Sequence, residues 1–349
     1  MLQGFADRAS RKALHEQRGK SLSAASSKVK RVLRGQGHAF GLDSFDLVFA
    51  DKTMPDHQIL TGTAGWSYPE WEGAVYPPGK PAQRLGIVSD YLDCVEVDSS
   101  FYRPPNARTT EGWCRAVANK PDFRFLAKAW QRFTHQRNEN WTPAEFELFV
   151  GGLTPLRDAH RLDALLFQFP WSFRNLPENR DWLSRIAEWF ADWPVAVEVR
   201  HDSWSGDEVQ GFFRQNRFIY CNIDQPGLAH CLRPSAYVTG DVGYFRLHGR
   251  NAKNWFREGG EPGDRYDYLY TEAELDELLR HIRVIASTTK RTFVIFNNHK
   301  DAKAFANALQ LKLRVQPGTT VRAPVSLVAR FPSLQGKVVP VGEQQLPLG

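Results

Sequence analysis

The chain has 349 residues, a formal net charge of +6 and an aromatic content of 13%, with 11 tryptophans and 23 phenylalanines, which is ample for a large core. No uncharged apolar stretch reaches the roughly 18 residues that a transmembrane helix needs, and the N-terminus has no secretory apolar segment. We therefore expect a cytoplasmic protein with no membrane partner.

The positive charge is concentrated at the start of the chain. Residues 1–34 hold nine Lys and Arg residues against Asp7 and Glu16, which leaves 36 of the 45 basic and 37 of the 39 acidic residues for the rest. A uniformly basic nucleic-acid-binding barrel is therefore not supported. We expect residues 1–57 to be a basic, flexible extension and connector, with a presequence or a polyanion-binding arm as alternatives.

Eight short apolar runs follow, and stretches long enough for a helix separate most of them. The runs are ILTGTAGW (59–66), CVEVDSS (94–100), FRFLAKA (123–129), DALLFQF (163–169), VAVEVRH (195–201), FIYCNID (218–224), YFRLHG (244–249) and TFVIFNN (292–298). Strands that alternate with helices form parallel βαβ units, and eight in succession predict an α/β fold with a single (β/α)8 TIM-type barrel over residues 58–315. The Pro-rich tail 316–349 should lie on the surface without adding a domain.

Two connections look unusual for a barrel. Residues 250–270 contain too much Gly and charge for a helix, and the next helix should begin at Thr271, with Glu274 completing a capping box. Residues 130–141 form a second basic and aromatic loop. Long loops at the carboxyl ends of barrel strands commonly hold substrate.

Polar side chains stand at the carboxyl ends of nearly all the predicted strands. Three pairs are spaced two residues apart, which places both members on one face of a strand: Glu96 with Asp98, Glu198 with Arg200, and Arg246 with His248. Comparable positions on other strands hold Lys128, Gln168, Asp224 and the neighbouring Asn297 and Asn298. An ion network that only plugs the barrel is the structural alternative, because buried charges are costly unless paired. Ionisable groups on five strands favour a ligand site at the carboxyl-end mouth.

The mouth is expected to bind an anion. Lys128, Arg200 and Arg246, joined by Arg250 and Arg257 from the long loop, suit a phosphate or a carboxylate. The candidate catalytic acid–base residues are Glu198, Glu96 and His248. The candidate ligand-binding residues, some of them aromatic side chains that could stack on a sugar or a base, are Trp66, Tyr68, Asp98, Tyr102, Lys128, Gln168, Arg200, Asp224, Arg246 and Asn297.

Several chemistries lack support. Barrel glycosidases commonly carry carboxylates on strands four and seven, where this chain has Gln168 and Arg246. The mouth offers His248, with His135 and His201 in loops, among several cations, so we expect no metal and no cofactor, with a metal site as the second choice. The GxGxxG, P-loop, HExxH and GxSxG motifs are absent. The four cysteines have no CxxC spacing and are expected to be free core thiols.

The segments GTAGWSYPEWEGAVYP, VEVDSSFYRPP, FLAKAWQRFTH, LLFQFPWSF, VAVEVRHDSW, YFRLHGR and FVIFNN closely resemble the YecE-like family of unknown function. The resemblance covers about residues 59 to 313 and implies a cytoplasmic (β/α)8 barrel without an established reaction. The family pattern EINSTFY corresponds to Glu96–Tyr102 here, with Asp98 in place of the asparagine. The fold that the resemblance implies is similar to endonuclease IV and to sugar isomerases, but those barrels use metal clusters.

Two functions remain open at this point. The first is an enzyme, of hydrolase or isomerase type, that acts on an anionic sugar- or nucleotide-like small molecule. The alternative is a nucleic-acid-binding protein without catalysis that uses the basic tail and the rim aromatics. The substrate and the oligomeric state are not predicted.

Overall fold

The structure is a computed structural model that describes residues 58–257, 259 and 263–342. The predictions made for residues 1–57 lie outside the described residues. Eight parallel strands close into one barrel in chain order, which confirms the predicted α/β barrel. The strands are β1 (Gln58–Ala64), β2 (Cys94–Val97), β3 (Arg124–Lys128), β4 (Leu162–Gln168), β5 (Val195–Glu198), β6 (Ile219–Asp224), β7 (Val242–Leu247) and β8 (Arg291–Phe296).

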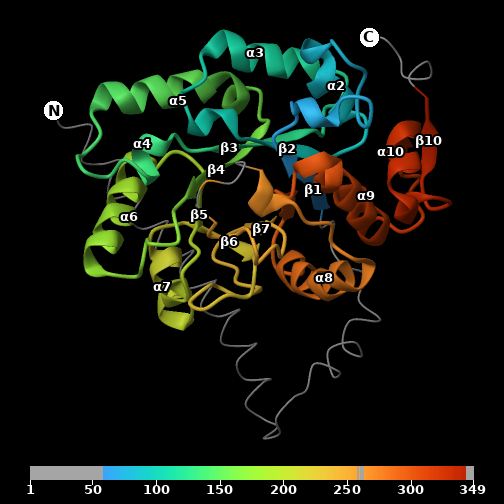
Figure 1. Ribbon diagram of the computed structural model, residues 1–349. Coiled ribbons are helices and arrows are strands. Elements are labelled where there is room, and N and C mark those ends of the chain that lie inside the picture. The colour runs from blue at the N-terminus through green and yellow to red at the C-terminus, as the bar shows by residue number, and fades with distance from the viewer. Residues whose placement is uncertain (1–57, 258, 260–262, 343–349) are drawn as a thin grey trace, which may run out of the picture. The chain divides into compact units, whose positions relative to one another are not determined.

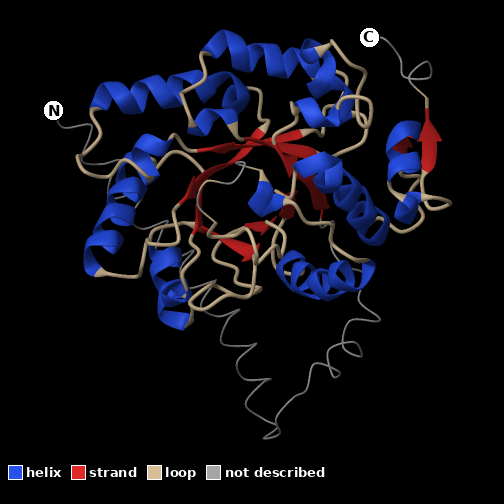
Figure 2. Ribbon diagram, in the orientation of Figure 1, coloured by secondary structure: helices blue, strands red, loops and turns tan. Residues whose placement is uncertain are grey.

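Helices surround the strands, as Figures 1 and 2 show. They are α2 (Arg84–Ser89), α3 (Ala107–Ala116), α4 (Gln131–Thr134), α5 (Pro143–Asp158), α6 (Pro177–Trp189), α7 (Asp207–Gln215), α8 (Glu272–Ala286) and α9 (Lys303–Val315). The predicted capping box at Thr271 is confirmed, because its side chain accepts from the amide of Glu274 and the carboxylate of Glu274 accepts from the amide of Thr271. Thr142 and Glu145 make the same arrangement at the start of α5.

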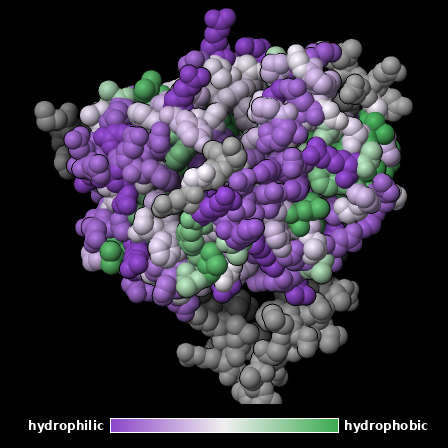
Figure 3. Space-filling model, viewed as in Figure 1, coloured by the Kyte–Doolittle hydropathy of each residue, from purple (hydrophilic) through white to green (hydrophobic). Residues whose placement is uncertain are grey.

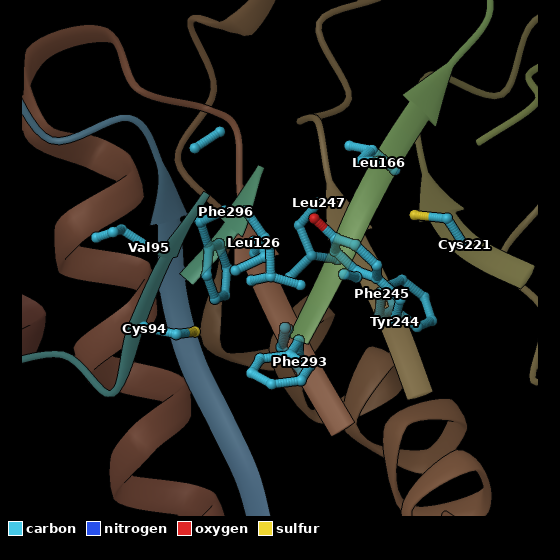
Figure 4. Close-up of a cluster of buried hydrophobic side chains, with 14 of the residues drawn as sticks. Cys94, Val95, Leu126, Leu166, Cys221, Tyr244, Phe245, Leu247, Phe293 and Phe296 are labelled. Atoms are coloured by element: carbon cyan, nitrogen blue, oxygen red, sulfur yellow. The ribbon is translucent and has the colours of Figure 1, made fainter. Parts of the chain in front are cut away.

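The strand register decides which side chains enter the barrel. Glu96 is level with Ala64 of β1 and Leu126 of β3, and Arg246 is level with Ile223 and Ile295. Side chains of paired residues share a face of the sheet. The buried strand side chains therefore form one layer inside the barrel and a second layer beneath the helices. Figure 4 shows a cluster of buried hydrophobic side chains, and those it labels belong to the strands.

Gly62 is required because β1 and β2 approach each other closely at its position. A side chain at Gly62 on β1 would place its Cβ 2.3 Å from the carbonyl oxygen of Cys94 and 2.7 Å from its sulfur. Real Cβ atoms do not come so close, so only glycine fits between β1 and β2 at this level. All four cysteines are free, and three are buried: Cys94, Cys221 and Cys231.

After α9 the chain forms β9 (Arg322–Pro324), α10 (Val325–Arg330) and β10 (Val339–Val341), and the two strands pair in parallel. In the view of Figure 3 the described surface is mostly hydrophilic, with separate small hydrophobic patches. None of the helices among the described residues has the length and apolar character needed to cross a bilayer.

Candidate functional site

A buried ion network lies inside the barrel near the carboxyl ends of β2, β5 and β7. Arg246 donates from Nη2 to Oε1 of Glu96 at 2.7 Å and from Nη1 to Oε2 of Glu198. The remaining oxygen of Glu96 accepts from the hydroxyl of Tyr244. Both carboxyl groups are completely buried, and Arg246 is 1% exposed. One guanidinium therefore joins two carboxyl groups from different strands in a medium without bulk water.

Glu198 is the most connected member of this network. Its Oε1 accepts from Nε of Arg200 at 2.9 Å and lies 3.2 Å from Nε2 of His248, although without the alignment of a hydrogen bond. Nδ1 of His248 faces the amide nitrogen of Asn297 at 3.0 Å. If that amide donates, the imidazole carries its proton on Nε2, toward Glu198.

The protonation states follow from burial and partners. Burial raises the pKa of Glu96, and Arg246 offsets only part of this effect. Burial also opposes ionisation of Glu198, but Arg246 and Arg200 overcome it and hold the pKa of that carboxyl well below its usual range. Burial lowers the pKa of His248 to about 3, so its imidazole is neutral at physiological pH.

A second pair lies nearer to solvent. Nζ of Lys128 is 3.3 Å from Oδ1 of Asp98, and it stands 4.2 Å from the centre of the Phe101 ring. Burial opposes ionisation of Asp98, but Lys128 and Arg246 outweigh it and lower the pKa of this carboxyl. Asp98, which replaces a neutral residue of the resembling pattern, is thus the partner of Lys128.

The long β7–α8 connection supplies two aromatic residues to the mouth. Trp255 is 3% exposed, and the Arg200 guanidinium lies over its ring, 5.5 Å from the centre. Tyr266 ends the short helix η6 (Asp264–Tyr266), and its ring lies 5.6 Å from His299, 6.2 Å from Trp255 and 6.3 Å from His248. Burial opposes ionisation of Tyr266, but Arg200, Lys128 and Arg246 outweigh it and lower the pKa of its phenol.

One predicted site residue lies outside the barrel. The carboxylate of Asp224 accepts from Nε and Nη2 of Arg250 and, at 2.6 Å, from the hydroxyl of Tyr270, which precedes α8. The prediction that Asp224 joins the pocket is wrong, because Ile223, not Asp224, is level with the inward-facing Arg246. Its partner Arg250 is likewise held away from the mouth.

This arrangement changes the expected charge balance. Three cations of the mouth, Lys128, Arg200 and Arg246, are matched by three carboxyl groups, Glu96, Asp98 and Glu198. The surplus of positive charge expected from Arg250 is absent, because Arg250 forms an ion pair with Asp224. Any anion subsite must therefore depend on local geometry and cannot rest on a net positive pocket.

The remaining predicted site residues differ in their contacts and in their exposure to solvent. Gln168 is level with Glu198 and donates to the carbonyl of Phe169 at 2.6 Å. The hydroxyl of Tyr68 donates to the carbonyl of Ala64, and its ring stacks on His299 at 4.6 Å. The other two aromatic residues are placed differently: the ring of Trp66 packs edge-on against Trp113 of α3, and Tyr102 is 66% exposed.

Three residues that contribute to the mouth were not singled out from the sequence. Tyr244 stands two positions before Arg246, so strand alternation could have found it. Tyr266 and His299 lie in connections without periodicity, where no sequence signal marks a side chain as facing the mouth. They are placed by contacts between distant parts of the chain, such as the stacking of His299 on Tyr68.

The family described as "Protein of unknown function DUF72" matches residues 60–328. The chain is similar to the UPF0759 protein YunF of Bacillus subtilis (strain 168), with 31% identity over 267 residues, 72% of this chain and 93% of that protein.

Solved structures agree with this result. A DUF72 family protein from Thermotoga maritima MSB8 is 33% identical, with a TM-score of 0.67 and coverage of 74% of this chain and 100% of the other. A DUF72 family protein from Enterococcus faecalis V583 is 26% identical, with a TM-score of 0.63 and coverage of 74% and 98%.

Proposed function

Since the chain belongs to the DUF72 family, whose function is unknown, we propose a function from the barrel mouth itself: an enzyme for a small anionic molecule of sugar- or nucleotide-like kind. The resemblance to the YecE-like family pointed to the same uncharacterised group of TIM barrels. The reaction is therefore argued from the side chains of the mouth.

The proposal rests on Arg200, whose guanidinium uses only part of its hydrogen-bonding capacity within the protein. Its Nε is bound to Glu198, while its terminal nitrogens have no hydrogen-bond partner within the described part of the chain and are not sealed from solvent. The ring of Trp255 lies on one side of the group, 5.5 Å from it. A guanidinium edge held in this way presents two parallel donors, which suits a carboxylate or a phosphate.

Tyr266 is the best-placed acid–base group for the reaction. It is half-buried, close to Trp255 and His248, and the cations around it favour its phenolate. A phenol with a lowered pKa can exchange a proton with substrate nearer to neutral pH than an ordinary tyrosine can.

Glu96 and Glu198, first considered as catalytic carboxylates, suit a different role. Neither has exposed surface, and each carboxyl oxygen already has a partner: Arg246 and Tyr244 for Glu96, Arg246 and Arg200 for Glu198. We assign them as positioning residues that fix Arg246 and Arg200. His248, which is buried and neutral, would support Glu198 in that role.

The proposal is tested by the thermal stability of the full chain in phosphate, sulfate or chloride at equal ionic strength. With 10 mM phosphate and a Kd of about 1 mM, binding adds about 1.4 kcal/mol, or roughly 2 to 3 °C in Tm. Arg200→Gln should remove the phosphate-specific part of the shift. Arg115→Gln is the control, because Arg115 is an exposed helix residue paired only loosely with Glu111.

An equal phosphate effect in the Arg200 variant, or no anion-specific effect in the wild type, would contradict the anion subsite. A single-stranded oligonucleotide that stabilises the wild type and Arg200→Gln equally would instead favour the nucleic-acid-binding alternative. The same measurement on a chain without residues 1–57 then shows whether the basic extension carries that binding.

A further inference from the structure

A group of metal-binding side chains stands beside the mouth, where β5 ends. His201 follows Arg200 directly and caps the short helix η5 (Asp202–Trp204). His230 comes from the β6–β7 connection, which a bridge between His201 and Cys231 holds against the end of β5. Two distant segments thus bring His201, Asp202 and His230, here called the His201 cluster, to one place.

The geometry of the His201 cluster matches a small cation. Nδ1 of His201 lies 3.1 Å from Oδ1 of Asp202, and Nδ1 of His230 lies 3.2 Å from Oδ2 of the same residue. Ligand atoms from all three residues lie within 4.8 Å of one another. Tetrahedral ligands about 2.0 to 2.1 Å from zinc are about 3.3 Å apart, and each of the two nitrogen–oxygen separations, one to each oxygen of Asp202, is close to this value. Small rotations of the exposed side chains would bring the three ligand atoms onto one ion.

We propose that the His201 cluster is a binding site for a divalent transition-metal ion of the zinc type, with water completing the coordination. Two imidazoles and one carboxylate are a donor set that zinc and its first-row neighbours prefer, whereas magnesium and calcium prefer oxygen donors. Asp202 and His230 are exposed, so an ion can enter from solvent without movement of the barrel.

The surroundings hold the His201 cluster in position. The two imidazole rings are parallel within 1°, with their centres 5.7 Å apart. The indole of Trp171 donates to the carbonyl of His230 at 3.1 Å, and its ring lies 5.2 Å from the ring of His201. This packing holds the backbone of His230 and the ring of His201 in place before an ion arrives, which reduces the entropy lost on binding.

Several contacts oppose the metal. The amide of Ser203 donates to Nδ1 of His201 at 3.1 Å, and the hydroxyl of Ser203 lies 3.0 Å from the same nitrogen, so an ion there competes with both. An ion also competes with the hydrogen bond between Nδ1 of His230 and Oδ2 of Asp202. The positive charge of Arg174 acts on His201 and partly offsets the negative charge of Asp202. These effects weaken the site, and they favour an exchangeable ion of moderate affinity over a permanent structural one.

The test is calorimetric titration of the chelator-washed full chain with Zn²⁺, repeated with Mg²⁺. His230→Asn is the main variant, because His230 has a φ of +55° and asparagine tolerates this backbone conformation. His160→Asn is a matched control, since His160 is also exposed and has a φ of +54°. Asp202→Asn is the second variant, and circular dichroism checks that each variant is folded.

The wild type and His160→Asn should bind one Zn²⁺ with the same affinity and give no heat with Mg²⁺ at the same concentration. His230→Asn and Asp202→Asn should bind Zn²⁺ at least about tenfold more weakly at that site. The proposal is overturned if the wild type binds no Zn²⁺, or if folded His230→Asn and Asp202→Asn retain the wild-type affinity. It is also overturned if His160→Asn loses as much affinity as they do. Because Arg200 is not altered, the result is independent of the anion test.

Discussion

Replacement of Arg246 by methionine is the most severe test of the buried network. Methionine keeps the apolar stem of the side chain but leaves Glu96 and Glu198 in the barrel without their shared cation. Removal of one partner of a buried ion pair costs about 3 to 5 kcal/mol. Here Glu96 loses its cation, and Glu198 keeps only Arg200. For a domain of this size, about 4 kcal/mol corresponds to a fall in Tm of roughly 6 to 8 °C.

The stability of Arg246→Met should also depend on pH in a way that differs from the wild type. Burial without the cation raises the folded pKa of both carboxyl groups above the usual value of 4.5. A carboxyl with a raised folded pKa favours folding at low pH and opposes it as pH rises through that pKa. The loss relative to wild type should therefore be largest near pH 8 and should shrink toward pH 5.

The control is the triple variant Arg246→Met, Glu96→Gln, Glu198→Gln. The glutamine oxygens can still accept from Tyr244 and Arg200, and no buried carboxylate is left without Arg246. Arg200 keeps a neutral acceptor in place of its carboxylate partner. The triple variant should recover more than half of the lost stability, measured by calorimetry. A single variant that falls by less than about 3 °C, or a triple variant no more stable than the single one, would show that the cost does not come from unpaired buried charge.

Three further outcomes follow from the same structure. His248 should show no ring titration by NMR between pH 5 and 8. Its folded pKa of about 3 lies below the unfolded value of 6.5, so stability is lost as pH falls below 6.5, and His248→Gln should reduce that loss. Tyr266→Phe should remove a tyrosine that ionises earlier than the others when phenolate absorbance is followed against pH. Gly62→Ala should cost up to about 3 kcal/mol in chemical denaturation because of Cys94, whereas Gly151→Ala, in open space on α5, should stabilise by up to about 1 kcal/mol.

The regular part of the barrel could be predicted from the sequence because strands have a fixed period. Alternation correctly placed Glu96, Glu198, Arg246 and His248 on inward faces, and the capping box correctly placed the start of α8. These features depend on neighbours one to four positions apart, which a single sequence displays directly.

Asp224 shows where the same rule fails. Every residue of β6 is buried, because parallel barrel strands are covered on both faces, so the run does not reveal which set of alternating side chains faces inward. The register with β7 places Cys221 and Ile223 inside and leaves Asp224 to pair with Arg250. That information comes from pairing between strands and from a loop, which a linear pattern does not contain.

Tyr266 was missed for a related reason. The connection that carries it is held by distant contacts, such as the amide of Asn251 donating to the carbonyl oxygens of Asp264 and Asp267. Composition predicted that this loop would matter at the mouth, but nothing in it marked Tyr266 as a side chain that would reach the cations. Tertiary contacts of this kind fix the part of the site that is most open to a ligand.

The pairing of Asp98 with Lys128 leads to a last prediction about ligand charge. Asp98→Asn removes one carboxylate from a mouth in which cations and carboxyl groups are matched, and it leaves Lys128 free to act on an anion. A charge taken as about 8 Å from the anion is worth roughly 2 kcal/mol at an effective dielectric constant of about 20, before screening by salt.

Phosphate should therefore bind Asp98→Asn about tenfold more tightly than the wild type, as measured by its phosphate-specific thermal shift over chloride. The variant itself should be less stable without phosphate, because the lowered pKa of Asp98 means that its ionised form favours folding above pH 4. Asp90→Asn is the matched control, since Asp90 pairs with Lys120 at 2.7 Å and none of the contacts of that pair involves the mouth. If phosphate binds Asp98→Asn no better than Asp90→Asn, Lys128 does not contribute to the anion subsite, and the ligand must be held through Arg200 alone.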